Sequence, residues 1–187
     1  MNFSKFIVFS LLNLFMIVGS ILIWPFFVLK NLPVIIKKGY IAYSIGIFMV
    51  ILDQYSKVLA IKRLSLFVPK EIIPKFLKLE LTKNHGAAFG IMQDKQWIFI
   101  LVAVTALLVF FLLSARPTKQ RTLLYYGYGF LIGGALGNLI DRLRFDYVID
   151  FIHLKGFPVF NIADLSIDIG LGFLFWHLIF DGEKVKS

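Results

Sequence analysis

Two aspartates, Asp150 and Asp164, border apolar segments of this chain, where a carboxylate is costly to place. They lie in the stretch VIDFIHLKGFPVFNIAD, residues 148–164, in which a loop with Gly156 and Pro158 returns one aspartate to the other. Two carboxyl groups that share one site cannot both ionise cheaply, so one holds a proton near neutral pH. The ionised group can take a proton from water while the neutral group polarises a carbonyl. The pair therefore predicts hydrolysis at a carbonyl group, without a metal ion or a covalent intermediate.

For Asp164 taken alone, a simpler interpretation is open. The run FNIAD precedes an apolar segment, and an aspartate there can cap a helix whose dipole favours a negative charge. The run VIDFI around Asp150 is β-prone and predicts a short strand just outside the bilayer. We therefore expect the two aspartates where a strand and the start of a helix meet.

By composition, the elements that carry these aspartates belong to a membrane protein. Of the 187 residues, 59% are hydrophobic and 17% are aromatic, and the mean hydropathy is +0.83. The formal net charge is +9, but Lys and Arg lie mostly between the apolar runs. We therefore expect membrane lipids with anionic headgroups as partners, and no nucleic acid. Cysteine is absent, which excludes disulfides, thiol nucleophiles and cysteine-based metal sites.

Five apolar runs are long enough, or nearly so, to cross a bilayer. They comprise residues 6–29, 40–59, 97–113, 122–140 and 165–180. The first run follows Lys5 and resembles a signal peptide, but it is too long and lacks a small-x-small cleavage site. We expect it to be a retained span, with a helix lying at the interface as the alternative.

Basic residues indicate which side of the membrane each loop faces. They cluster in residues 30–38, in residues 115–121 and in the tail 184–186, which the positive-inside rule places in the cytoplasm. Residues 61–95 carry seven Lys or Arg of their own, so the count is not clean, but short loops carry this signal best. In this orientation the other conspicuous polar residues all fall on the outer face, which suggests one site. These residues are Asp53, Lys57, Asn84, Asn138, Asp141, Arg142, Asp150 and Asp164.

Most of these polar residues also have a structural interpretation. Asp53 and Lys57 are four residues apart and can simply pair on one helix face. Asp141 and Arg142 can orient loops or contact headgroups. The two asparagines can bind a peptide backbone or support a carboxylate, since an amide both donates and accepts.

Two local patterns predict elements that frame this region. In residues 77–83, leucines alternate with polar residues, which predicts a strand with one apolar face, and Pro69 and Pro74 exclude a continuous helix before it. Gly129, Gly133 and Gly137 recur every four residues, which indicates a helix-packing stripe.

Other hydrolytic chemistries lack their residues. His85, His153 and His177 do not have the spacing of metal ligands, and neither H-E-x-x-H nor G-x-S-x-G occurs. We therefore expect no metal ion and no cofactor.

Five motifs together carry a family resemblance. They are DQYSK at 53–57, NHGAAFG at 84–90, GGALGNLIDR at 133–142, VIDFI at 148–152 and FPVFNIAD at 157–164. In this order they resemble the bacterial lipoprotein signal peptidases, the signal peptidase II family of membrane aspartyl peptidases, over residues 40–180. The resemblance implies a mainly α-helical membrane protein with four core transmembrane helices and a small extracytoplasmic β element. Residues 38–187 would form this domain, and residues 1–37 would be an extra hydrophobic segment.

The resemblance also implies roles for individual residues. Asp150 and Asp164 would be the catalytic dyad. Residues that shape or support the site would be Asp53, Lys57, Asn84, Gly86, Asn138, Asp141, Arg142, Asn161 and Ala163. The substrate would be a prolipoprotein with a diacylglyceryl group on cysteine, cleaved just before that cysteine. The enzyme would be a monomer in the bacterial cytoplasmic membrane, with its site on the extracytoplasmic side.

Two other functions are alternatives for a membrane protein with these acidic residues. A small proton-coupled transporter would place acidic residues towards both faces or at mid-depth, often in a duplicated half, and no repeat is visible here. A non-catalytic assembly or lipid-binding membrane protein would not require both Asp150 and Asp164.

Overall fold

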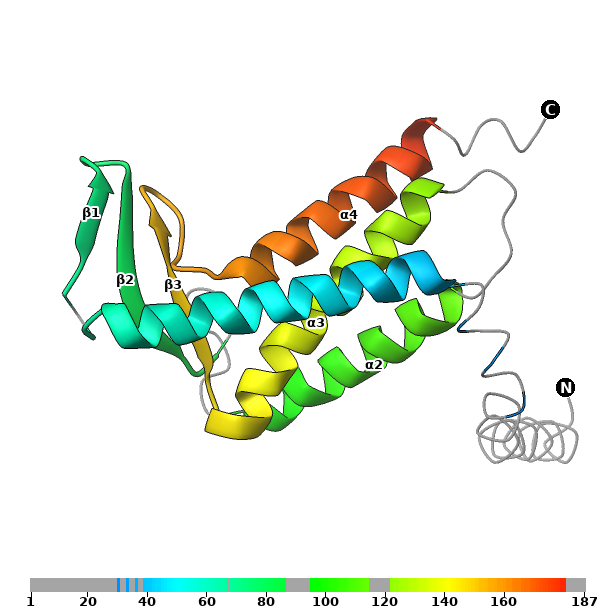
Figure 1. Cartoon of the computed structure of the whole chain (residues 1–187), viewed down its shortest axis with the longest axis horizontal. Helices are drawn as coiled ribbons and strands as arrows, with labels where there is room; N and C mark the ends of the chain where they lie inside the picture. Colours follow the sequence, from blue (N-terminus) through cyan, green and yellow to red (C-terminus); the bar gives the residue numbers. More distant parts are fainter. Residues whose placement is uncertain are drawn as a thin grey trace, which may run out of the picture.

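A computed structural model describes residues 30, 33, 36, 39–66, 68–86, 95–114 and 122–180. Within these residues, four helices are long and apolar enough to cross a membrane (Figure 1). They are Gly39–Arg63, α2 (Gln96–Ser114), α3 (Thr122–Phe145) and α4 (Ile162–Phe180). The predicted mainly helical membrane fold is confirmed, and each helix overlaps a predicted span. The predicted span at 6–29, the basic linker 115–121 and the tail lie outside the described residues.

Helices α3 and α4 extend beyond their predicted apolar runs where they approach the polar residues, and polar contacts explain both extensions. Helix α3 continues past residue 140 to Phe145, because the buried Asp141 is held by partners from other elements. Helix α4 begins at Ile162, because Asn161 caps it: Asn161 Oδ1 accepts from the Asp164 amide at 3.0 Å. In return Asp164 Oδ2 accepts from the Asn161 amide at 3.1 Å, which completes a capping box. Asp164 is thus the third residue of α4, and the cap residue is Asn161.

Helix α3 lies at the centre of the helix packing, and small residues let its neighbours approach. A side chain on Gly129 would meet Ile45 Cβ at 2.7 Å, and one on Gly133 would meet Met49 Cβ at 2.6 Å. The predicted packing stripe is therefore confirmed at these two glycines, which contact the Gly39–Arg63 helix. A neighbouring glycine, Gly134, contacts α4 instead.

We expect Gly134→Ala to destabilise the protein by about 1–3 kcal/mol, because the added methyl group would overlap the Ala163 carbonyl oxygen and Ile167 Cγ1. Gly172→Ala in α4 is the matched control, since no atom of the described residues lies within 4 Å of a Cβ placed there. Thermal unfolding in detergent measures the difference. Equal unfolding midpoints for the two variants would contradict close α3–α4 packing.

Three antiparallel strands form a sheet at one end of the helices (Figure 1). They are β1 (Lys70–Ile73), β2 (Leu77–Asn84) and β3 (Val148–Leu154), in the order β1-β2-β3. The strands predicted at 77–83 and at 148–152 are confirmed. The connection from α3 into β3 passes through Asp146, whose φ of 61° lies in the left-handed region. This tight turn brings β3 back beside the end of α3.

The register of β2 against β3 sets the face on which Asp150 lies. Thr82 pairs with Asp150, and Leu79 pairs with Ile152, so three residue steps on β2 match two on β3. Such a bulge redirects side chains and is common beside active sites. As a result Thr82, Asn84 and Asp150 share one face of the sheet.

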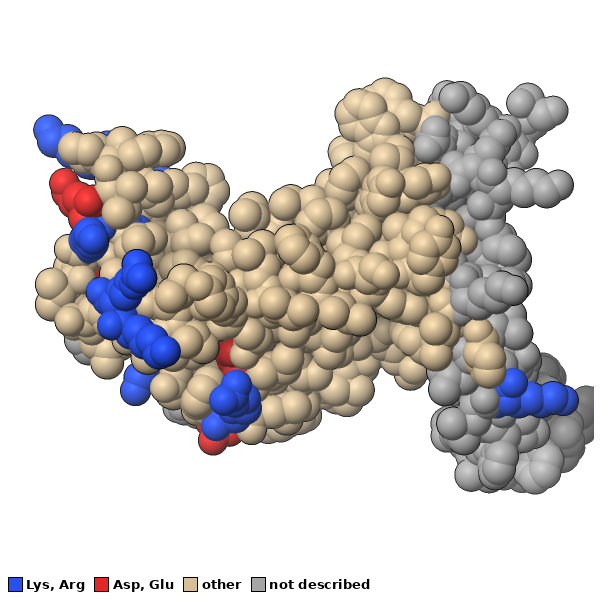
Figure 2. All heavy atoms as spheres, viewed as in Figure 1, with Lys and Arg blue, Asp and Glu red and all other residues tan. Residues whose placement is uncertain are grey.

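The surface separates charge from apolar area. Figure 2 shows Lys and Arg gathered on the end that carries the sheet, where Lys70, Lys75 and Lys155 are exposed. The helices instead expose large apolar side chains, such as Phe48 at 61% and Val102 at 61%. Apolar area of this extent suits contact with lipid, and the charged end suits contact with water and headgroups.

Candidate active site

Asp150 and Asp164 reach the same site from two elements, β3 and the first turn of α4. Asn161 bridges them: its Nδ2 donates to Asp150 Oδ1 at 2.6 Å, and its backbone amide donates to Asp164 Oδ2 at 3.1 Å. Asp150 is 1% exposed and Asn161 is fully buried. The two predicted catalytic aspartates are therefore linked by one buried residue, through its side chain and its backbone amide.

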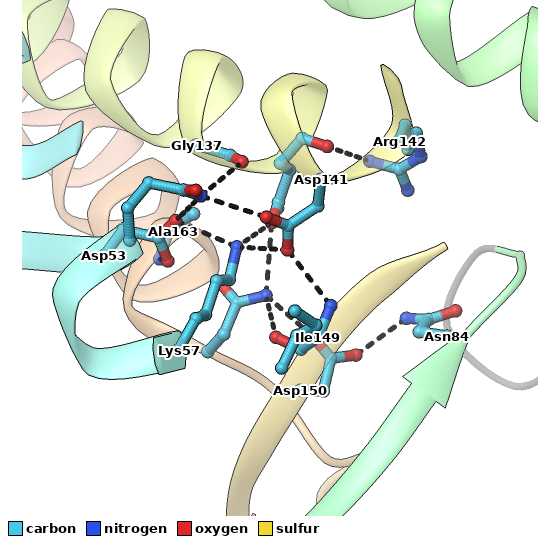
Figure 3. Close-up of polar contacts among 12 residues, drawn as sticks. Asp53, Lys57, Asn84, Gly137, Asp141, Arg142, Ile149, Asp150 and Ala163 are labelled. Carbon is cyan, nitrogen blue, oxygen red and sulfur yellow. Dashed lines mark hydrogen bonds and ion pairs between the residues drawn. The ribbon is translucent and has the colours of Figure 1, made fainter. Parts of the chain in front are cut away.

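A second asparagine completes the surroundings of each carboxyl group. Asn84 Nδ2 donates to Asp150 Oδ2 at 2.8 Å, and Asn138 Nδ2 donates to Asp164 Oδ1 at 2.8 Å. Each carboxyl group thus accepts two N–H donors, and Figure 3 shows Asn84 reaching Asp150 from β2. Charge-assisted hydrogen bonds of this kind hold a carboxyl group in a fixed orientation.

Donors on neighbouring residues decide which way the two amides point. The Gly86 amide donates to Asn84 Oδ1 at 3.0 Å, and Lys57 Nζ donates to Asn138 Oδ1 at 3.2 Å. An ammonium or a backbone N–H can only donate, so each amide oxygen must face it. The amide nitrogens are then left to face Asp150 and Asp164.

Lys57 lies at the centre of a buried ion cluster beside the dyad (Figure 3). Its side chain is 2% exposed, and Nζ lies 2.8 Å from Asp53 Oδ2 and 2.9 Å from Asp141 Oδ2. With Asn138 as the third acceptor, each of its three donors has a partner. The predicted Asp53–Lys57 pair is confirmed, but it also includes Asp141.

The two carboxylates of this cluster fasten the elements that carry the dyad. Asp53 Oδ1 accepts from the Ala163 amide at 3.0 Å, next to Asp164, and Asp141 Oδ2 accepts from the Ile149 amide at 3.1 Å, next to Asp150. Asp141 thus orients β3, and headgroups are not its partner. The cluster joins two helices to the residues that precede each catalytic candidate.

Two further residues contribute to the site: Gln54 was not singled out from the sequence, and Gly137 was assigned to helix packing alone. Gln54 Nε2 donates to Asp141 Oδ1 at 2.9 Å and to the Gly137 carbonyl at 3.2 Å, so it adds to the same cluster. A side chain on Gly137 would meet Asp53 Oδ2 at 2.6 Å, so this glycine makes room for the site as well as for helix packing. The position of Gln54 directly after Asp53 was the available signal.

Arg142 borders the dyad without pairing with it. Its guanidinium lies 5.0 Å from the Phe99 ring centre, and Nη1 donates to the Asn138 carbonyl at 3.4 Å. Its charge interacts with those of Asp164 and Asp150, and its buried Nε has no hydrogen-bond partner within the described part of the chain. Arg142 therefore keeps donor capacity beside the carboxyl groups.

Burial raises the pKa of Asp150 from 3.8 to about 7, and the nearby charge of Asp164 adds to the rise. Hydrogen bonds from Asn84 and Asn161 and the charge of Lys57 oppose it. Because the folded protein holds this proton more tightly than the unfolded chain, the resulting stability is present at low pH and is lost as the pH rises through about 7. The site is therefore built to hold a proton on Asp150 close to neutral pH.

Comparisons with known proteins identify the family. The family model described as Signal peptidase (SPase) II matches residues 45–180. This chain belongs to the signal peptidase II family. The lipoprotein signal peptidase of Symbiobacterium thermophilum is 37% identical over 144 residues, which is 75% of this chain and 95% of that protein. The lipoprotein signal peptidase of Halothermothrix orenii is 37% identical over 143 residues, which is 76% of this chain and 97% of that protein.

Solved structures agree with this family membership. A bacterial membrane enzyme solved by the in meso method at 2.3 Å is similar with a TM-score of 0.72 and 31% identity, over 76% of this chain and 90% of that chain. A second, solved at 1.9 Å, has a TM-score of 0.69 and 32% identity over 75% and 93%. As a signal peptidase II, the protein is a membrane aspartic-type endopeptidase, and no comparison favours a transporter. The predicted division between residues 37 and 38 stays a prediction.

Proposed function

We propose that this signal peptidase II acts on prolipoproteins that carry a diacylglyceryl group, cleaves just before the modified cysteine and releases the signal peptide. The observation that carries the proposal is the bridging of Asp150 and Asp164 by Asn161, where α4 meets the sheet. Relatives described as lipoprotein signal peptidases support the substrate class. A lipid on cysteine and an apolar signal peptide would hold the scissile bond at this depth.

In the reaction we propose, Asp150 begins with the proton and Asp164 is ionised. Asp164 takes a proton from water, and the water oxygen attacks the scissile carbonyl carbon while Asp150 protonates the carbonyl oxygen. As the tetrahedral intermediate collapses, Asp150 recovers its proton and Asp164 passes its own to the leaving nitrogen. One water is consumed, one peptide bond is broken, and both carboxyl groups return to their starting states.

The residues around the dyad are proposed to position these groups rather than to react. Asn84, Asn138 and Asn161 hold the two carboxyl groups, and the cluster around Lys57 holds the asparagines. Arg142 is free to donate to a substrate oxygen through the Nε that has no partner in the described chain. Holding the groups before the substrate arrives lowers the entropic cost of the reaction.

We further propose that the site lies on the extracytoplasmic side of the bacterial cytoplasmic membrane, and that the protein acts as a monomer. The basic runs at 30–38 and 115–121 support this orientation, because they lie at helix ends remote from the sheet along the chain. The lysines around the sheet would then contact anionic headgroups of the outer leaflet.

Reconstituted vesicles test the substrate proposal. The purified protein is incubated with the same precursor in its diacylglyceryl-modified and unmodified forms, and mass spectrometry locates the cut. We expect cleavage of the modified precursor only, one bond before the cysteine, with no loss on addition of EDTA. Cleavage of both forms at equal rates, or loss with EDTA that a metal ion restores, would contradict the proposal.

The pH dependence of this cleavage follows from the state of Asp150. We expect the rate to fall as the pH rises through about 7, because Asp150 then loses the proton that it must donate. Asn84→Ala removes a hydrogen bond that lowers the pKa of Asp150. The alkaline limb of the curve of cleavage rate against pH should therefore move to higher pH. The pH profiles of the two proteins in the same vesicles give the comparison, and coincident alkaline limbs would count against Asp150 as the acid.

A further inference from the structure

One aromatic ring, that of Tyr147, contacts both residues that flank Asn84 in the sequence. The ammonium of Lys83 lies 4.9 Å from the centre of the Tyr147 ring, and the His85 ring lies 5.3 Å from it in a tilted arrangement. The ring of Phe145, the last residue of α3, stacks on Tyr147 at 5.8 Å. Tyr147 therefore ties the end of β2 to the end of α3.

The strand register places this ring behind the active-site face of the sheet. Asn84 pairs with Val148, and its side chain reaches Asp150 on the front face (Figure 3). Successive side chains of a strand point to opposite faces, so Lys83 lies on the back face. Its ammonium meets the ring of Tyr147, the residue just before β3. The ring covers the back of the strand end whose front carries the donor to Asp150.

Asn84 needs such support because it is the last residue of β2. The terminal pairs of a strand open more readily than central ones. Its hydrogen bond to Asp150 is 2.8 Å long, and a hydrogen bond weakens steeply when its geometry is lost. Gly86 orients the Asn84 amide, and the terminal pair with Val148 holds its backbone against β3, so contacts made by the neighbouring residues can strengthen this end of the strand.

We propose that Tyr147 is a positioning residue of the peptidase, whose ring holds the end of β2 so that Asn84 donates to Asp150. The contacts are made by the ring itself, with the Lys83 ammonium and the His85 and Phe145 rings. The proposal rests on the proposed function of the dyad. It adds a residue that touches neither carboxyl group.

The test compares two substitutions of Tyr147 in the full-length protein, reconstituted and assayed with a lipid-modified precursor. Tyr147→Leu removes the ring and should lower kcat roughly 10-fold, because the Asn84 donor is then poorly held. Tyr147→Phe keeps the ring and should stay within about twofold of the unsubstituted protein. Phe157→Leu is the matched control, since it removes a 65% exposed ring at the other end of β3 and should not change kcat.

A double-variant measurement separates positioning from a general structural effect. Asn84→Ala alone should lower kcat by roughly 10–100-fold, and adding Tyr147→Leu should then cost little more, because the donor is already absent. Tyr147→Leu should also move the alkaline limb of the pH profile in the same direction as Asn84→Ala. The other charged groups that interact with Asp150 are Asp164, Lys57 and Arg142, and none of them is altered.

Two outcomes would overturn the proposal. If Tyr147→Leu has the kcat of the unsubstituted protein, the ring does not act through Asn84. The same follows if the double variant loses kcat by the full product of the two single-variant losses. If Tyr147→Leu accumulates poorly, Lys83→Met removes the cation from the same ring and is judged by the same double-variant criterion. If the unsubstituted protein and Phe157→Leu both fail to cleave the precursor, the proposed function fails instead.

Discussion

Asp150→Asn and Asp164→Asn should each lower the rate of prolipoprotein cleavage by roughly 1,000-fold or more. An amide of nearly the same shape keeps the packing but can neither give nor take the proton that the reaction moves. One oxygen acceptor remains at each position, for Asn161 Nδ2 and for Asn138 Nδ2, and only the second donor to each group loses its partner, which is a local cost. Both variants should therefore insert and accumulate like the unsubstituted protein. The measurement is cleavage of a lipid-modified precursor in membranes that contain equal amounts of each variant.

Asp168→Asn is the matched control for this pair. Asp168 is an exposed aspartate on the same helix, four residues after Asp164, and takes no part in the network around the dyad. The Asp168→Asn protein should cleave the lipid-modified precursor at the rate of the unsubstituted protein. Near-normal cleavage by either dyad variant would refute the assignment of the two aspartates, whereas an equal loss in Asp168→Asn would point to damage to α4.

Lys57→Met lowers the free energy of unfolding by about 3–5 kcal/mol, the second large effect that we expect. The lysine side chain is 2% exposed and compensates two carboxylates that are themselves at most 1% exposed, Asp53 and Asp141. Methionine fills much of the same volume but leaves both carboxylates without their cation. Chemical or thermal unfolding in detergent measures the loss, with the exposed Lys155→Met as control.

A triple variant tests the physical reason. Replacing Asp53 and Asp141 by asparagine in the Lys57→Met protein removes the uncompensated charges, and most of the lost stability should return. Activity should not return with it. Without the ammonium, Asn138 Oδ1 loses one of its two donors and keeps only Asn161 Nδ2, so the amide is less firmly held towards Asp164. A Lys57→Met protein as stable as the unsubstituted one would show that the cluster is not held by this charge.

Much of the fold follows from the sequence, because a bilayer imposes strong and local requirements. Four of the predicted spans became helices, since only a long apolar helix satisfies its backbone in lipid. The alternation in residues 77–83 predicted β2, because the side-chain period of a strand is a property of the chain itself. Polar residues at span ends drew attention to the site, since placing them near lipid is costly.

The internal arrangement of the site required the tertiary structure. In the sequence, Asn161 is one residue in one motif among several. In the structure it both caps α4 and bridges the dyad. Gln54 is marked in the sequence only by its position beside Asp53, and it contacts a carboxylate 87 residues away. Such contacts depend on how helices and strands meet, which no local period encodes.

What the sequence determined by itself is the pair of candidate reacting groups and the element that carries each of them. Asp150 and Asp164 could be named because carboxyl groups at a lipid boundary are conspicuous wherever they occur. Only the tertiary structure decided how these groups are held: which way the Asn84 and Asn138 amides point, and how Tyr147 supports the end of β2. The physical reason is that a hydrogen bond is set by distances of a few tenths of an ångström between distant parts of the chain, whereas hydropathy is set by residue type alone.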